Sequence, residues 1–265
     1  MEGPYRWFYS QTSWLYIKLF ENGLFFINYW SFVHLWGGIV IFMIISASKV
    51  NRKWLWLFCI LLLIELPEVV FLQFSNNSVS EIIKDKAIEI IAGLLGSLIC
   101  YRLIILKPVK TFSASVSRIF QMGFISFTFA FIWVESYDYH YNMASLNTPG
   151  LNLWAFFLWG IGGYYIIEGY LFFKKRVENK VILMILVWVF YFMILLIIEF
   201  TGYHFMHIAE ISSSKNSPLI FGLIHGSFWL HLYYIISPFL IVSFYEIFIR
   251  ISALAKEETS QTVTQ

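Results

Sequence analysis

The sequence predicts an all-α integral membrane protein, a polytopic bundle of about seven transmembrane helices. Hydrophobic residues make up 59% of the 265-residue chain and charged residues only 13%, whereas soluble domains hold about 25% charged residues. The apolar residues gather in long runs, and a helix needs about 20 of them to cross a bilayer. The number of Lys and Arg residues is also alternately high and low in successive loops, as expected when successive loops lie on opposite sides of a membrane.

The apolar runs define the expected elements. Seven spans are predicted at about 29–48, 54–74, 87–106, 117–135, 152–173, 181–200 and 219–249. The last run contains Pro238, which predicts a kink, a break or a helix that extends into the cytoplasm. Before the first span, residues 11–27 mix aromatic and charged side chains and predict an interfacial amphipathic helix.

The chain is thus expected to have three parts. They are an N-terminal interfacial segment (1–28), a seven-helix transmembrane domain (29–251) and a disordered cytoplasmic tail (252–265). The tail is predicted to be disordered because it is rich in Ser, Thr, Gln and Glu. The first 25 residues predict no cleavable signal peptide.

The positive charges predict the orientation. Loops assigned to one side hold thirteen of the 18 Lys and Arg residues, and the other side holds five. Because cytoplasmic loops are enriched in Lys and Arg, the N-terminus is expected outside and the C-terminus in the cytoplasm of a cell membrane. The net charge of +2 is too small and too scattered to favour nucleic acid binding. The lipid bilayer is the expected partner.

Carboxylates within the predicted spans are the first candidates for function. An ionisable group at a helix centre costs about 2.5–3.5 kcal/mol on insertion scales and often marks a functional site. Glu65 and Glu68 share one helix face, while Glu135 and Glu199 end the fourth and sixth spans. We predict these four as catalytic acids or bases, since a carboxyl group in an apolar bundle has a raised pKa. The alternative for Glu65 and Glu68 is a structural pair beside Pro67.

Histidines and further acids suggest a metal site on the same side. His140, His204 and His207 lie in loops or helix ends predicted to face outwards, and Asp85 and Glu89 share a face of the third span. Imidazole and carboxylate groups are ligands of Zn, Mn and non-haem Fe. We therefore predict these five as ligands of a divalent metal. The alternatives are ordinary loop-edge histidines and an interfacial charge cluster.

A short pattern occurs twice in the second half. Residues 135–141 and 199–205 both fit Glu-x-x-x-Tyr-His-aromatic and end equivalent spans. A proline then precedes the next span in each case. The pattern favours a tandem repeat of two hairpins, spans four and five and spans six and seven. The other interpretation is chance similarity in a tyrosine-rich chain.

Several spans also contain closely spaced glycines. Gly93 and Gly96, and Gly160, Gly162 and Gly163, predict close packing between helices. Such glycines can also leave room for a flat apolar ligand, and packing is the favoured interpretation.

The acidic helix ends resemble those of integral-membrane carotenoid cyclases and hydratases. The residues that resemble them are Glu65, Pro67, Glu68, Glu135 and Glu199, which form no continuous stretch. This resemblance implies an enzyme that protonates or hydrates a polyene with carboxylates at helix ends.

Three functions are therefore expected. The favoured one is an enzyme that acts on a lipid or isoprenoid-like substrate in the outer half of the bundle, with an acid and histidine site there. The second is a proton- or cation-coupled transporter, against which the nearly uncharged inner half counts. The third is a non-catalytic membrane assembly subunit.

Overall fold

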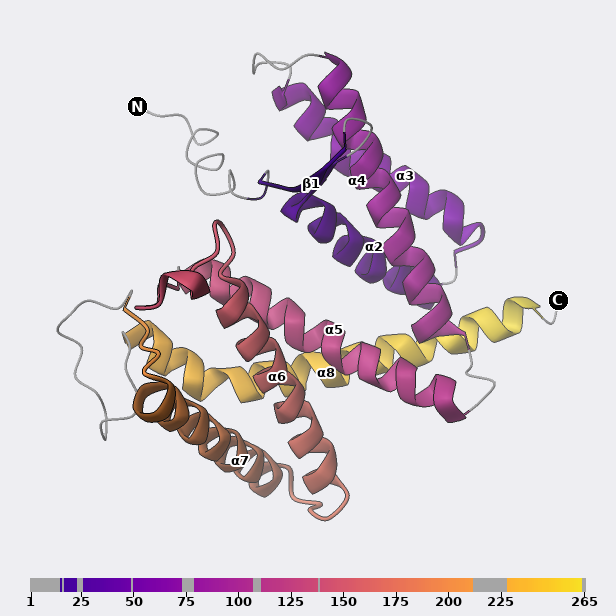
Figure 1. The fold of residues 1–265 in the computed structure, drawn as a ribbon. Coiled ribbons are helices and arrows are strands. Elements are labelled where there is room, and N and C mark those ends of the chain that lie inside the picture. The colour runs from indigo at the N-terminus through magenta and orange to yellow at the C-terminus, as the bar shows by residue number, and fades with distance from the viewer. Residues whose placement is uncertain are drawn as a thin grey trace. The chain divides into compact units, whose positions relative to one another are not determined.

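The computed structural model describes residues 15, 17–22, 26–48, 50–72, 79–106, 111–137, 139–211 and 228–263. Within these ranges the chain forms seven α-helices (Figure 1). They are α2 (Tyr29–Ala47), α3 (Lys53–Leu72), α4 (Val79–Cys100), α5 (Thr111–Tyr137), α6 (Leu153–Lys174), α7 (Lys180–Phe200) and α8 (Phe228–Val263). Single π-helical turns, η2 (Tyr101–Ile105) and η4 (Thr201–Met206), continue α4 and α7. The predicted all-α bundle is confirmed.

Among the described residues, six helices are long and apolar enough to cross a membrane. These segments are Tyr29–Ala47, Ile83–Ile105, Ser115–Tyr137, Leu153–Lys174, Lys180–Met206 and His231–Glu258. The 20-residue helix α3 covers residues 54–72 of the predicted second span, whose membrane crossing stays a prediction.

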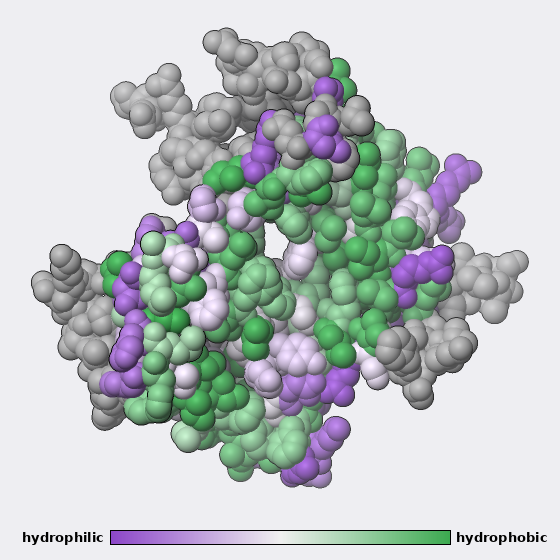
Figure 2. Space-filling model, viewed as in Figure 1, coloured by the Kyte–Doolittle hydropathy of each residue, from purple (hydrophilic) through white to green (hydrophobic). Residues whose placement is uncertain are grey.

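The outer surface of the helices is apolar. Val181, Met193 and Ile197 on α7 are 68%, 55% and 62% exposed. Figure 2 shows hydrophobic residues covering much of the helical surface on the face in view. Such side chains suit contact with lipid tails rather than water. The chain is therefore a multi-pass membrane protein.

The segment before α2 differs from its prediction. Strands β1 (Lys18–Glu21) and β2 (Phe26–Asn28) pair antiparallel. The amphipathic helix predicted over 11–27 is therefore wrong for these residues. Aromatic and β-branched side chains in the two strands favour extended backbone. The sequence between them also contains Asn22-Gly23, a dipeptide typical of hairpin turns.

Helix α8 extends beyond the predicted last span. It is one helix of 36 residues with Pro238 inside it. Residues 252–263 are helical, which corrects the prediction of disorder from residue 252. The sequence there, Ser-Ala-Leu-Ala-Lys-Glu-Glu, consists mostly of good helix formers that continue an existing helix. Ser252 and Ala255 are also buried, at 2% and 0% exposed.

The chain divides into two compact units. Unit 1 comprises residues 1–117 and 249–265, and unit 2 comprises residues 118–248. Helices α2, α3 and α4 pack against one another in unit 1 (Figure 1). Helices α6 and α7 form an antiparallel pair in unit 2. The single transmembrane domain over 29–251 stays a prediction.

Small residues set the packing of α2 against α4 in unit 1. A Cβ atom added at Gly38 would lie 2.0 Å from the carbonyl oxygen of Gly93, and one added at Gly96 would lie 1.9 Å from that of Leu35. The Ser97 hydroxyl donates a hydrogen bond across the crossing to the carbonyl oxygen of Gly38, at 3.0 Å. The two backbones therefore touch, as the glycines of α4 predicted.

We expect Gly38→Ala to destabilise the protein by about 1–3 kcal/mol, the usual range for overpacking. Within a helix, alanine is ordinarily more stabilising than glycine by about 1 kcal/mol. A loss of stability in Gly38→Ala would therefore indicate the contact between the two backbones. Gly37→Ala is the matched control, because a Cβ atom there meets nothing within 4 Å. Thermal unfolding of both variants in detergent measures the difference. Equal stability of the two variants would contradict the close crossing.

Candidate functional site

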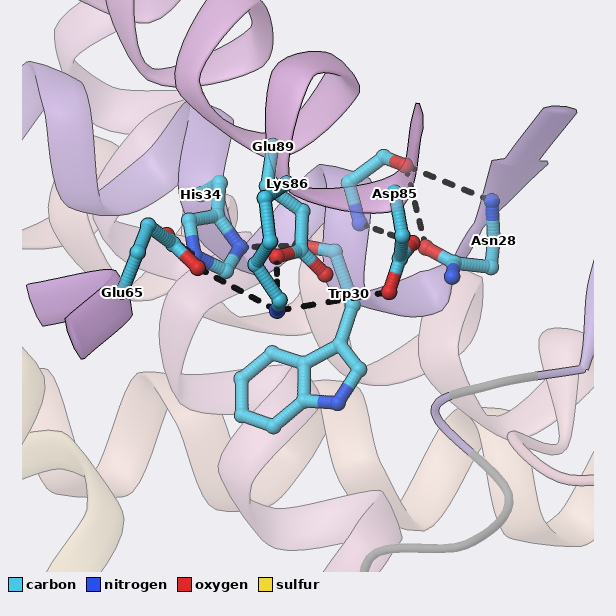
Figure 3. Close-up of polar contacts among 8 residues, drawn as sticks. Asn28, Trp30, His34, Glu65, Asp85, Lys86 and Glu89 are labelled. Atoms are coloured by element: carbon cyan, nitrogen blue, oxygen red, sulfur yellow. Dashed lines mark hydrogen bonds and ion pairs between the residues drawn. The ribbon is translucent and has the colours of Figure 1, made fainter. Parts of the chain in front are cut away.

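Four ionisable side chains are buried among α2, α3 and α4, and we call them the charge cluster: His34, Glu65, Lys86 and Glu89 (Figure 3). Nε2 of His34 lies 2.7 Å from Oε1 of Glu65. Nζ of Lys86 lies 3.2 Å from Oε2 of Glu65 and 2.5 Å from Oε2 of Glu89. None of the four is more than 8% exposed. Charges so far from water require partners, and here each has one.

The crossing of α2 and α4 positions two members of the charge cluster. His34 precedes Gly38 by four residues, and Glu89 precedes Gly93 by four, so each lies about one helical turn from the contact between backbones. The start of α2 is fixed by Asn28, whose Oδ1 accepts the backbone N–H of Ser31 at 2.9 Å. Cap and crossing together hold His34 towards Glu65 on α3.

The hydrogen-bond partners of His34 indicate which of its ring nitrogens carry protons. Nδ1 lies 3.0 Å from the carbonyl oxygen of Trp30. Because a carbonyl oxygen only accepts, Nδ1 carries a proton. The contact between Nε2 and Glu65 needs another proton, which the imidazole and the carboxyl group share. This proton and the Lys86 ammonium face the carboxyl groups of Glu65 and Glu89, and the carboxylate of Asp85 lies 4.0 Å from the same ammonium.

Unit 2 contains a cavity of about 310 Å³ at the end where α5 and α7 finish and α6 and α8 begin. Aliphatic side chains of α7 and many aromatic rings line it. The rings include Tyr139, Trp154, Trp159, Tyr191, Tyr203 and Tyr234. Two carboxyl groups, those of Glu199 and Glu210, also line the cavity. The cavity therefore combines apolar walls with acids, as ligand sites commonly do.

The two acids of the cavity come from neighbouring segments. Glu199 is in the last turn of α7, and the Tyr234 hydroxyl on α8 donates to its Oε1 at 3.3 Å. Glu210 follows η4 and is only 7% exposed. Between them, His207 adopts the left-handed conformation, with φ of 54°, and turns the chain back after η4.

An aromatic group closes one side of the cavity. The indole N–H groups of Trp133 and Trp159 donate to the Tyr139 hydroxyl oxygen, at 2.8 and 2.9 Å. The Trp133 ring stacks on Tyr233 of α8, with centroids 3.7 Å apart. Burial raises the pKa of Tyr139 well above its usual value, so its hydroxyl stays neutral. These contacts tie α5, α6 and α8 together at this end of unit 2.

The loops after α5 and α7 also pair with each other. Tyr141 and Glu210 form an antiparallel bridge. Asn142 donates from Nδ2 to the carbonyl oxygen of His207 and accepts the N–H of Ala209, both at 2.9 Å. This pairing holds the segment that bears Glu210 against the cavity.

The residues predicted to be catalytic do not form one group. Glu65 belongs to the charge cluster in unit 1, and Glu199 lines the cavity in unit 2. Glu135 is half-buried in the last turn of α5. Glu68 belongs to α3, but its side chain lies outside the described residues.

The predicted metal ligands are likewise divided between the units. Glu89 is in the charge cluster, and the half-buried Asp85 has Oδ2 4.0 Å from Nζ of Lys86. His140, His204 and His207 are exposed in unit 2. Within the described part of the chain, the one group of three with metal-ligand spacing is the imidazole and two carboxylates of the charge cluster, whose ligand atoms lie within 4.8 Å of one another.

Sequence reasoning did not select His34 or Lys86. The spacing of four residues from His34 to Gly38 and from Glu89 to Gly93 could have indicated that both polar groups lie on the faces where the helices meet. Lys86 is three residues before Glu89, and this spacing also suits an interfacial charge pair.

The two copies of the Glu-x-x-x-Tyr-His-aromatic pattern differ in conformation. In the first copy, Tyr139 and His140 come after α5 and belong to no helix or strand. In the second, Tyr203 and His204 continue α7 as the π-helical turn η4. The tandem repeat therefore stays a prediction.

Comparison with protein-family models, with curated proteins and with solved structures gives no match. The class that the fold defines is a multi-pass helical membrane protein.

Proposed function

We propose that the protein is a membrane enzyme that binds a lipid or isoprenoid-like substrate in the unit 2 cavity. The observation that supports this most directly is the presence of two carboxyl groups in a cavity that is otherwise aromatic and aliphatic. An apolar chain suits such walls, and the acids supply the only carboxyl groups among the described lining residues. A cavity of about 310 Å³ is at the lower end of the range for small-molecule sites, about 300–1,000 Å³.

In this proposal, Glu199 and Glu210 perform acid and base chemistry on the bound substrate. Glu199 delivers a proton to the substrate, and the Tyr234 hydroxyl, 3.3 Å from Oε1, orients its carboxyl group. Glu210 takes up the proton that the substrate loses. The faces of surrounding aromatic rings favour positive charge that develops on an apolar substrate.

Glu199→Gln tests the proposal. We expect the purified variant to retain an unconverted lipid or isoprenoid compound that the wild-type protein does not, as measured by mass spectrometry of solvent extracts. Glu168→Gln is the matched control, because Glu168 is an exposed partner of Arg118 in the same unit and does not line the cavity. Identical extracts from all three proteins, together with an unchanged lipid profile in the host, would refute the enzymatic proposal.

The charge cluster favours a second candidate, a proton- or cation-coupled transporter, since buried ionisable groups in spans mark ion paths. Solute uptake into proteoliposomes that depends on a proton or cation gradient would support the transporter. Solute uptake that is equal with and without both gradients would exclude it.

We also propose the orientation that the positive charges predict, in a cell membrane with the N-terminus outside. A cysteine introduced at Ala144, between α5 and α6, should then react with an impermeant thiol reagent in intact cells. A cysteine at Val177, between α6 and α7, should react only after lysis. The experiment requires Cys59 and Cys100 to be replaced by alanine. The opposite labelling pattern would invert the topology.

A further inference from the structure

The charge cluster has the ligands of a metal centre. His34 supplies one imidazole nitrogen, and Glu65 and Glu89 supply carboxylate oxygens, all within 4.8 Å of one another. Imidazole with carboxylates is a ligand set of Mn²⁺, Fe²⁺ and Zn²⁺. Ligand atoms at about 2.1 Å from one ion lie at most about 4.2 Å apart. A small movement of the three side chains towards one another would therefore allow all three to bind the same ion.

The surroundings orient these ligands. The Nδ1–H group of His34 donates to the carbonyl oxygen of Trp30 at 3.0 Å, which leaves Nε2 facing Glu65. Metal-bound histidines usually have this kind of second hydrogen bond, because it fixes the ring and its tautomer. Glu89 is 0% exposed, and among the described residues no hydrogen-bond donor reaches its Oε1. A buried carboxylate oxygen of this kind is suited to an additional cationic partner.

Lys86 already supplies a cation to the two carboxylates. Its ammonium lies between the two carboxylates, at 3.2 Å from Glu65 and 2.5 Å from Glu89. Lys86 is on the same helix as Glu89, two residues after the exposed Lys84, and its side chain has four rotatable bonds through which the ammonium can leave the carboxylates. The ammonium and the proton shared by His34 and Glu65 supply two positive charges. A divalent ion would supply the same number.

We propose that His34, Glu65 and Glu89 bind one divalent transition-metal ion, and that Lys86 is a tethered cation that competes with the metal for the two carboxylates. This site is in unit 1 and does not depend on the cavity of unit 2. Failure of one proposal therefore leaves the other unaffected.

The test is metal binding by the full-length protein in detergent. The protein is treated with a chelator, exchanged into chelator-free buffer and titrated with MnCl₂ or ZnCl₂, and bound metal is measured by mass spectrometry after desalting. We expect one ion per chain, and a Lys86→Met variant should bind it at least about tenfold more tightly because a competing charge is gone. Lys84→Met removes a nearby exposed lysine as the matched control and should not change the affinity.

A second measurement applies if Lys86→Met does not fold. Metal should raise the melting temperature of the wild-type protein, since a ligand that binds only the folded state stabilises it. His34→Gln should abolish this rise, whereas His140→Gln, at an exposed histidine, should preserve it. The proposal is overturned if neither the wild-type protein nor a folded Lys86 variant binds metal. It is also overturned if His34→Gln and Glu89→Gln bind as well as the wild-type protein.

Discussion

Gly162→Leu should remove ligand binding from the unit 2 cavity and leave the fold intact. Gly162 lines the cavity, and a Cβ atom added there meets nothing within 4 Å. A leucine side chain would therefore extend into free space and occupy a substantial part of about 310 Å³. We expect at least about a tenfold loss in retained ligand, equivalent to about 1.4 kcal/mol of binding free energy. The measurement is the amount of lipid-like compound per protein after purification.

Gly123→Leu is the matched control for this effect. Gly123 is a helix glycine in the same unit that also has no atom within 4 Å of an added Cβ, and it does not line the cavity. Both variants replace glycine by leucine on α5 or α6, so changes in helix propensity and hydrophobicity cancel in the comparison. Equal ligand content in the two variants would show that the cavity does not bind the compound.

The contrast between Gly162 and Gly163 shows what sequence alone could not decide. Both were predicted to pack helices together. A Cβ atom at Gly163 would lie 3.1 Å from Cβ of Ser126, so this glycine does lie at a helix contact. Gly162 faces open space in the cavity. The two residues are about 100° apart around α6, and which side faces a neighbour depends on the rotation of the helix in the bundle.

The same limit explains the charge cluster. Hydropathy predicted the spans that hold His34 and Glu89, because each helix must be apolar over its whole length. Sequence reasoning grouped Glu65 with Glu199 and Glu89 with distant histidines, because it could compare only positions along the membrane normal. The structure instead pairs Glu65 with His34 across two helices. Partners across helices are set by packing contacts such as that of Gly38 against Gly93, which no pattern within one helix specifies.

Lys86→Met should destabilise the protein by about 3–5 kcal/mol, the usual cost of removing one partner from a buried ion pair. Lys86 is 6% exposed and contacts the carboxylates of both Glu65 and Glu89. Without the ammonium, the buried carboxylate of Glu89 loses the cation that lies 2.5 Å from its Oε2. Thermal or denaturant unfolding in detergent with a chelator present measures the loss. Lys84→Met, at an exposed lysine, should stay within about 0.5 kcal/mol of the wild-type protein.

The double variant Lys86→Met/Glu89→Gln separates charge from packing. Glutamine keeps the shape of Glu89 and removes its negative charge, so position 89 no longer holds a buried carboxylate that needs the Lys86 ammonium. We therefore expect the double variant to be more stable than Lys86→Met alone, although Glu89→Gln by itself also breaks an ion pair. A coupling free energy between the two substitutions of about 1–3 kcal/mol is the expected sign of direct contact. Additive losses would mean that Lys86 stabilises α4 through the packing of its side chain and not through its charge.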